Sequence, residues 1–360
     1  MTKLINLFIC MLCLASNCFA NDMRIRSIIM TSDGQTIHAI YTKIDGDTDV
    51  VTGNKNVQAW SWTAQKIGDK KFIKSVYGLA NNTLYFGGYE QSYVKQSNLA
   101  FKDLSEENQD FSYANISAIS AFGDGNTILM GGDDSDDDGA WLFLGKKNVN
   151  ETTWSEPRLN TCTPDNIGPA NINGIAVDDK TVYLGISNFN DPHASGICTS
   201  QDYGRTWNWL ENFPEPNAST IFSSSKGEII YASGFEYDDN QKQDAAKFEH
   251  LFSSIDGGKT WNAINFAEKS SDYYINAIAG SRDGSIIYAG SAAGLWINNN
   301  GIWQEAKYPK EMPHMIDALA TSADGKIVAA ACHGVSGHAS IWISQDVGQT
   351  WIKSWPDYSK

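Results

Sequence analysis

An eight-residue motif recurs along this chain of 360 residues and limits its fold more than any other feature. Three copies match the pattern S-x-D-x-G-x-T-W and begin at Ser200, Ser254 and Ser344. The first two copies start 54 residues apart, and the last two start 90 apart with a degenerate copy at residues 298–303 between them. A period of roughly 45 residues is typical of chains that repeat one supersecondary unit many times.

A second pattern keeps the same interval: a polar turn, then a run of β-branched or aromatic residues that ends in small ones. One copy reads I-I-Y-A-G at residues 286–290. Because another short apolar segment precedes each turn, the pattern predicts a hairpin between two strands. The seven turns are Asp33-Gly34, Asn81-Asn82, Asp124-Gly125, Asp178-Asp179, Lys226-Gly227, Asp283-Gly284 and Asp324-Gly325.

Four short antiparallel strands in each of seven repeats predict an all-β protein, a seven-bladed β-propeller. The innermost strands should be rich in Ala, Gly and Ser, since the blades crowd together at the axis. Helical periodicity is nearly absent, and residues 243–248 are the one segment that we expect to form a helical turn. No linker-like run divides the chain, so we expect a single domain over residues 21–360.

The octapeptides resemble the Asp-box, or BNR repeat, of the β-propeller superfamily that contains sialidases and sortilin-type receptors. The resemblance spans residues 24–355 and implies that each motif joins the third and fourth strands of a blade. There the aspartate accepts hydrogen bonds from turn N–H groups, the glycine permits a positive φ, and the tryptophan packs between sheets. We therefore interpret the motif as structural. Its residues are Ser200, Asp202, Gly204, Thr206, Trp207, Ser254, Asp256, Gly258, Thr260, Trp261, Ser344, Asp346, Gly348, Thr350 and Trp351.

Sialidase chemistry does not follow from this resemblance, because function lies in sites added to a fold. A sialidase needs three arginines that converge on the substrate carboxylate, and other residues do not supply that geometry. Beyond the first twenty residues the chain has five arginines, and two of them lie in predicted turns. We expect no sialidase activity. The five are Arg24, Arg26, Arg158, Arg205 and Arg282.

Residues 1–20 have the pattern of a secretory signal peptide: Lys3, an apolar run, and a small-x-small site that ends at Ala20. Lipidation at Cys18 is the alternative, although the residues before it are a poor lipobox. No later segment approaches the roughly 18 apolar residues of a membrane span. The protein is therefore expected to be secreted or periplasmic, where Cys162 and Cys198 can form a disulfide.

Acidic residues outnumber basic ones 42 to 27, which gives a formal net charge of −15. This charge opposes the counterion release that drives nucleic-acid binding. Nucleic acid is therefore excluded as a partner.

The loops between the second and third strands are long, polar and unlike one another. In a four-stranded blade they lie on the face opposite the octapeptide turns, where a ligand is expected. The candidate ligand-binding residues are Glu90, Tyr93, Asp191, His193, Tyr237, Asp238, His333 and His338.

One of these loops is rich in aspartate. Asp134, Asp136 and Asp138 precede Gly139 in the order of a D-x-D-x-D-G calcium loop, but the twelfth position is Gly145 rather than glutamate. The loop either binds Ca²⁺ or is a solvated acidic tip that discourages edge pairing. The expected fold requires no other cofactor.

Together these observations favour a monomeric binding or scaffold module that holds a protein or glycan ligand on its loop-rich acidic face and catalyses no reaction of its own. The alternative is a glycoside hydrolase or lyase with a pair of carboxylates in the central funnel, at the separations that retaining or inverting chemistry requires. The sequence contains no nucleophile elbow, phosphate loop or zinc-helix motif.

Overall fold

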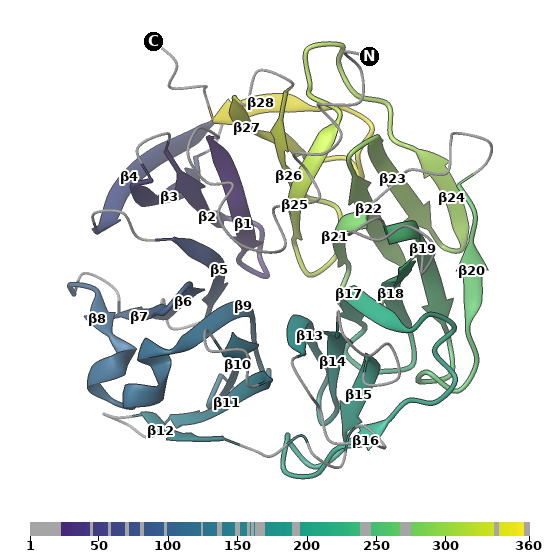
Figure 1. Cartoon of the computed structure of the whole chain (residues 1–360). Coiled ribbons are helices and arrows are strands. Elements are labelled where there is room, and N and C mark those ends of the chain that lie inside the picture. The colour runs from purple at the N-terminus through teal and green to yellow at the C-terminus, as the bar shows by residue number, and fades with distance from the viewer. Residues whose placement is uncertain are drawn as a thin grey trace, which may run out of the picture.

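The computed structural model shows a ring of seven four-stranded antiparallel sheets (Figure 1), which confirms the predicted fold class. It describes residues 23–43, 46–56, 59–68, 72–79, 83–96, 99–123, 125–134, 139–147, 152–156, 159, 162, 170–188, 195–237, 246–266, 275–334 and 338–355, with 134, 236–237 and 246–249 in backbone only. The expected signal peptide lies outside these residues. Within them, no helix has the length and apolar character of a membrane span.

Each blade uses four strands that are consecutive in the chain. Blades 1 to 3 contain β1 Arg24–Met30, β2 Thr36–Thr42, β3 Thr48–Lys55 and β4 Trp60–Gly68, then β5 Ile73–Gly78, β6 Thr83–Gly88, β7 Gln91–Gln96 and β8 Lys102–Asp103, then β9 Ala114–Ala121, β10 Thr127–Asp134, β11 Ala140–Lys147 and β12 Thr152–Ser155. Two short 3₁₀ helices, η1 Leu104–Glu106 and η2 Gln109–Ser112, connect blades 2 and 3.

The remaining blades follow the same order. They contain β13 Asn171–Val177, β14 Val182–Ser187, β15 Gly196–Ser200 and β16 Asn208–Trp209, then β17 Asn217–Ser223, β18 Ile230–Tyr237, β19 Ala246–Ser254 and β20 Asn262–Ile264, then β21 Ile275–Gly280, β22 Ile286–Ser291, β23 Gly294–Asn299 and β24 Ile302–Glu305, and finally β25 Met315–Thr321, β26 Val328–His333, β27 Ala339–Ser344 and β28 Ile352–Trp355. The expected helical turn at residues 243–248 is wrong from residue 246 onward, where the chain is already strand β19.

The first strand of every blade is innermost, and the fourth is outermost (Figure 1). Because the strands alternate in direction, the hairpins between strands 1 and 2 and between strands 3 and 4 share one face of the ring, which we call the turn face. The loops between strands 2 and 3 and the connections between blades share the other, the loop face.

The core consists of seven buried apolar clusters, one in each gap between neighbouring blades. Between blades 3 and 4, for example, Leu129 and Leu144 pack with Leu184 and Trp207. Both faces of each sheet are therefore covered, and the middle strands are largely buried; β14 is buried at all six positions. Burying one such side chain contributes about 1.5–3 kcal/mol, so these gaps hold the ring together.

Hydrogen bonds between neighbouring blades form a belt on the turn face. Asp179 N donates to Ser225 O (3.2 Å) and Ser225 N to Arg282 O (2.8 Å). Arg282 N then donates to Ala323 O (2.8 Å) and Ala323 N to Ser32 O (2.9 Å). These residues occupy the same position in the first hairpins of blades 4, 5, 6, 7 and 1, so the belt crosses the point where the ends of the chain meet.

The three octapeptides form the third-to-fourth-strand hairpins of blades 4, 5 and 7. In the first copy, Ser200 Oγ donates to Asp202 Oδ1 (2.8 Å) and accepts from Gly204 N (2.9 Å). Thr206 donates two more hydrogen bonds to the Asp202 carboxylate, from its N–H to Oδ1 (2.8 Å) and from its Oγ1 to Oδ2 (2.7 Å). The other two copies repeat all four bonds.

Two consecutive residues of this turn have positive φ, Tyr203 at 63° and Gly204 at 81° in the first copy. Trp207 follows, is buried between blades 3 and 4, and donates from Nε1 to Gly204 O (3.1 Å). The Thr206 N–H and hydroxyl hold the pKa of Asp202 at about 2. The degenerate copy in blade 6 is a shorter hairpin, in which Asn300 and Gly301 alone form the turn with positive φ at both residues.

Blades 1 and 7 close the ring without exchanging a strand. The rings of Tyr41 and Trp355 meet edge to face with centroids 4.7 Å apart. Trp62 Nε1 donates to Ser354 Oγ (3.1 Å), and Ile25 and Ile341 are both buried in the same cluster. Closure therefore depends on noncovalent packing between the two ends of the chain.

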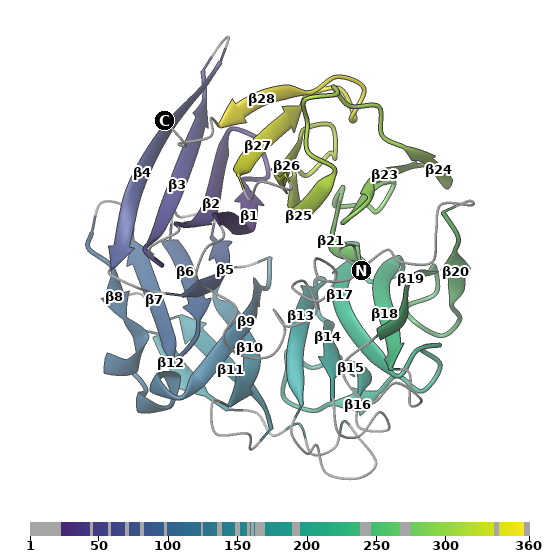
Figure 2. The same ribbon diagram turned by 45° about the horizontal axis from the view of Figure 1, so that its top comes forward.

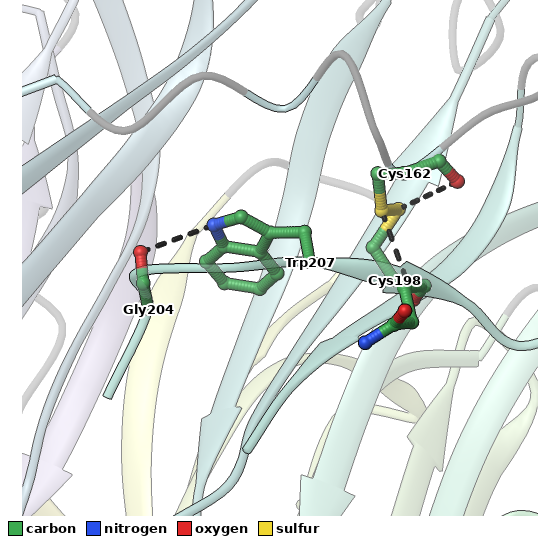
Figure 3. The surroundings of a disulfide bond; sticks show 5 residues. Cys162, Cys198, Gly204 and Trp207 are labelled. Atoms are coloured by element: carbon green, nitrogen blue, oxygen red, sulfur yellow. Dashed lines mark hydrogen bonds between the residues drawn. A yellow bond between two sulfur atoms is a disulfide. The ribbon is translucent and has the colours of Figure 1, made fainter. Parts of the chain in front are cut away.

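Cys162 and Cys198 form a disulfide with their Cα atoms 5.8 Å apart (Figure 3). Cys198 lies in β15, and both cysteines belong to the buried cluster between blades 3 and 4, which also contains Trp207. The bridge ties the connection between these blades to the core. Cys332 is a buried free thiol in β26.

Candidate functional site

A β-bulge interrupts the first strand of every blade close to the loop face. At each bulge the first strand has one residue more than its partner; in blade 1 it is Arg26, between Ile25, which pairs with Tyr41, and Ser27, which pairs with Ile40. In blade 5, Ser219 and Thr220 together lie opposite one residue of β18, and we count Ser219 because it directly follows the buried apolar residue, as in the other blades. Bulges re-aim side chains and are frequent beside functional sites. We call the seven inserted residues the bulge ring: Arg26, Lys74, Ser117, Asn173, Ser219, Asn276 and Asp317.

The residues around the bulge are nearly the same in all blades. A buried apolar residue precedes it, a small residue follows, and an aliphatic residue comes next; blade 6 reads Ile275, Asn276, Ala277, Ile278. Close approach of the two strands requires glycine opposite two bulges, since a Cβ at Gly132 would overlap the carbonyl oxygen of Asn115. Packing therefore fixes the residues on either side of the bulge, which we call its frame, whereas the inserted side chain varies from blade to blade.

Two members of the ring link adjacent blades. Asn173 Nδ2 donates to Ala218 O (3.2 Å) of blade 5, and Asn276 Nδ2 donates to Ile316 O (2.9 Å) of blade 7. Both acceptors are the residue before the next blade's bulge. Asn173 and Asn276 therefore help to hold neighbouring blades together.

The charged members of the ring are confined to blades 7, 1 and 2. The pKa of Lys74 is lowered mainly by burial and is also affected by Asp133, which raises it, and Arg26, which lowers it. The charges of Arg26 and Asp133 are therefore near enough to act on the Lys74 ammonium. In blade 7, Asp317 Oδ2 lies 2.7 Å from Nδ1 of His333, and both side chains are largely buried. We call these five residues the charged arc.

A row of paired residues extends the charged arc into blades 2 and 3. Tyr89 forms an isolated bridge with Asn115, and Asn115 pairs with Asp133, so the three side chains share one side of the local sheet. Tyr89 is 47% exposed, whereas Asn115 is 6% exposed and its Oδ1 has no hydrogen-bond partner among the described atoms. Glu90, beside Tyr89, has a φ of 52°, which is rare for a residue other than glycine.

Some predicted site residues are described, and others are not. Glu90 and His338 lie on the loop face, while Tyr93 is in β7 with its side chain in the core between blades 1 and 2, and His333 ends β26 as a buried residue. Blade 2 has a tight Tyr89–Glu90 turn where we expected a long loop. The other candidates lie outside the described residues, or, for Tyr237, are described in backbone only: Asp191, His193, Tyr237 and Asp238.

The expected calcium loop is likewise undescribed. Asp134 is described in backbone only, at the end of β10, and Asp136 and Asp138 lie outside the described residues. Among the side chains that the structure describes, no group of three or more His, Cys, Asp or Glu residues is arranged to hold a metal ion.

Sequence reasoning missed the bulge ring as a set. It considered Arg26 only as an arginine of a sialidase clamp and Asp133 only as one carboxylate of a possible hydrolase pair, and it did not select Lys74 or Asp317. The signal was present, because the order apolar, polar, small, aliphatic recurs at the start of every first strand. It was hidden because the inserted residue breaks the alternation by which strands are recognised.

Comparison of the sequence with models of known protein families gives no match, and neither does comparison with curated proteins.

Proposed function

We propose that the octapeptide hairpins are Asp-boxes and that the chain is an exported binding or scaffold module, which holds a protein or glycan ligand at the bulge ring. The observation that carries this proposal is the ring itself. Seven repeats keep one backbone device at the same place around the axis, and the residue that it carries is the one that differs among them.

The charged arc is the part of the ring best suited to contact a ligand. It sets two cations, Arg26 and Lys74, within electrostatic range of each other in a chain whose net charge is −15, so this part of the ring can attract an anionic group. Exposed Tyr89 adds an apolar ring with a hydroxyl, a combination that suits both sugar and protein ligands. The buried acceptor of Asn115 costs about 1–3 kcal/mol unless a donor reaches it.

Export is supported by the leader-like residues 1–20 and by the Cys162–Cys198 bridge, because disulfides persist in oxidising compartments. The Asp-box assignment is supported by the four hydrogen bonds that three blades share.

Two screens test the proposal: the labelled protein on a glycan array, and the immobilised protein exposed to extracellular and periplasmic proteins. Whichever binding is found should weaken at least tenfold in Lys74→Gln, since a hydrogen bond to a charged group contributes about 1.5–3 kcal/mol. The control is Lys226→Gln, the same change at an exposed residue of the turn face, which should bind like wild type.

Equal losses in the two variants would overturn the proposed site. Turnover of chromogenic glycosides that disappears in Asp133→Asn would overturn the proposal of a module without catalysis and support the hydrolase alternative.

A further inference from the structure

Blade 1 differs from the other six blades in its outermost strand. Strand β4 has 9 residues, whereas the fourth strands of the other blades have between 2 and 4. Figure 2 shows β3 and β4 as a long ribbon at the periphery of the ring. Radial repetition normally leaves only short edges, so β4 is an unusually long exposed edge, a template for pairing with another strand.

The pairing of β4 with β3 identifies the backbone groups that face outward. Asn56 N donates to Ala59 O at the hairpin, and antiparallel pairs alternate between bonded and non-bonded. Ser61, Thr63 and Gln65 therefore bond to β3. Lys55, which lies opposite Trp60, supports this assignment, because its N–H donates away from β4, to Gln35 O.

By the same alternation, the N–H and C=O groups of Trp62, Ala64 and Lys66 point away from the sheet. The side chains of residues 63–66 are exposed on both faces of the strand. No proline or acidic residue interrupts residues 60–68, and the sequence between β3 and β4 does not contain the octapeptide motif of blades 4, 5 and 7.

We propose that this edge docks the same edge of a second copy of the chain, in an antiparallel pair centred on Ala64. This register sets Ala64 against Ala64 of the second copy, and Trp62 against Lys66 in both directions. Trp62, Ala64 and Lys66 then occupy bonded pairs, which gives six backbone hydrogen bonds. The two blades form one continuous eight-stranded sheet across a twofold axis.

The side chains are compatible with this register. Lys66 is the only charged residue of the strand, and it lies opposite Trp62 of the second copy rather than opposite another lysine. Its ammonium is already paired with Asp47, and a cation beside an indole is favourable. Thr63 faces Gln65, both polar. Like charges, which destabilise cross-strand pairs, do not meet.

The dimer goes beyond the proposed function and replaces the expectation of a monomer. Because β4 is at the periphery and the bulge ring surrounds the axis, pairing leaves both rings exposed. A dimer would present two binding sites and raise avidity for a multivalent ligand.

Sedimentation velocity over a range of protein concentrations tests the proposal. The mass of the wild-type species should rise from that of one chain to that of two chains as the protein concentration rises. Ala64→Pro removes an outward N–H and no bond to β3, so it should weaken association at least tenfold. At concentrations where wild type is a single chain, the two proteins should have the same melting temperature. Ala64→Ser keeps the N–H and should associate like wild type.

Thr63→Pro checks the phase of the hydrogen bonds. It removes an N–H that bonds to β3, so it should lower the melting temperature where Ala64→Pro does not. The proposal is overturned if wild type remains a single chain at the highest concentration, or if Ala64→Pro associates as wild type does. Binding of a different polypeptide to the edge of a monomeric wild type would equally refute self-pairing.

Discussion

At the scale of single residues, the bulge shows that the residue exposed to a ligand can change without a change in the residues that maintain the fold. Ile172 and Ile275 precede the bulge in two blades and are buried, because packing between sheets demands an apolar side chain there. Asn173 and Asn276 follow them and contact the next blade, whereas Arg26 and Lys74 at the same position carry charge. The frame can thus stay constant while the inserted residue changes.

The aspartate of the first octapeptide links the stability of the protein to pH. The pKa of Asp202 is held at about 2, against an ordinary 3.8, by the N–H and hydroxyl of Thr206. Because the folded-state pKa is the lower one, its contribution to stability is complete above pH 4 and is lost as the pH falls toward 2. In Asp202→Asn the melting temperature should fall at neutral pH and should depend less on pH between 4 and 2.

Asp179→Asn is the control for this measurement. Asp179 is an exposed carboxylate on the same face, and its Oδ1 lies 4.0 Å from a guanidinium nitrogen of Arg282. It should melt with the wild-type pH profile. An Asp202→Asn protein with the full wild-type acid dependence would show that this carboxylate is not held by its turn.

At the scale of elements, hairpins were predictable, whereas strand irregularities were not. The turns at Asp33-Gly34 and Asp283-Gly284 have their own residue signature, in which Asp33 and Asp283 accept from nearby N–H groups and the glycine φ is positive. A bulge has no such signature, since it depends on how closely two backbones approach. Tyr93 was also placed wrongly in a loop, because the length of the turn before it was not evident from the sequence; the turn is tight, and β7 begins two residues before Tyr93.

Close backbone approach at the blade 3 bulge predicts a large effect of adding one methyl group. Gly132→Ala should lower the free energy of unfolding by about 1–3 kcal/mol, because the new Cβ meets the Asn115 carbonyl rather than a movable side chain. Gly123→Ala is the matched control, since nothing lies within 4 Å of a Cβ there. Urea unfolding curves for the two variants measure the difference, and equal midpoints would show that the bulge is looser than described.

The disulfide predicts the number of reactive thiols. After cleavage of residues 1–20, alkylation of the denatured, unreduced protein should modify Cys332 alone, and prior reduction should raise the number to three. Intact-mass spectrometry distinguishes these results. Reduction of this bridge, whose cysteines are separated by 36 in sequence, should also cost about 3–4 kcal/mol of stability in the chain-entropy account. Three modified thiols before reduction would show that no bridge forms.

At the scale of the whole molecule, the two faces of the ring have different roles. The turn face carries the hydrogen-bonded belt and the octapeptide hairpins, which hold neighbouring blades in register. The loop face carries the bulge ring. The sequence predicted this division from the repeats alone, but it could not place Arg26 near Lys74, because the two lie 48 positions apart in the first strands of successive blades.

Ring closure predicts that Trp355 is among the residues most sensitive to truncation. It is 1% exposed and packs against Tyr41 from the other end of the chain. Trp355→Ala should lower the free energy of unfolding by about 3–5 kcal/mol, since truncating a buried tryptophan leaves a cavity at a noncovalent junction. Ile352→Ala in the same strand, 65% exposed, should change it by less than about 0.5 kcal/mol. Similar losses in both variants, followed by chemical denaturation, would contradict this view of closure.

Hydrogen–deuterium exchange with the strongest ligand from the screens tests the central claim most directly. If the ligand binds at the bulge ring, amides at the starts of β1, β5, β9 and β25 should exchange more slowly in the complex, while those of the octapeptide hairpins on the turn face should exchange as before. Protection confined to the turn face, with no change at these four strands, would contradict the account.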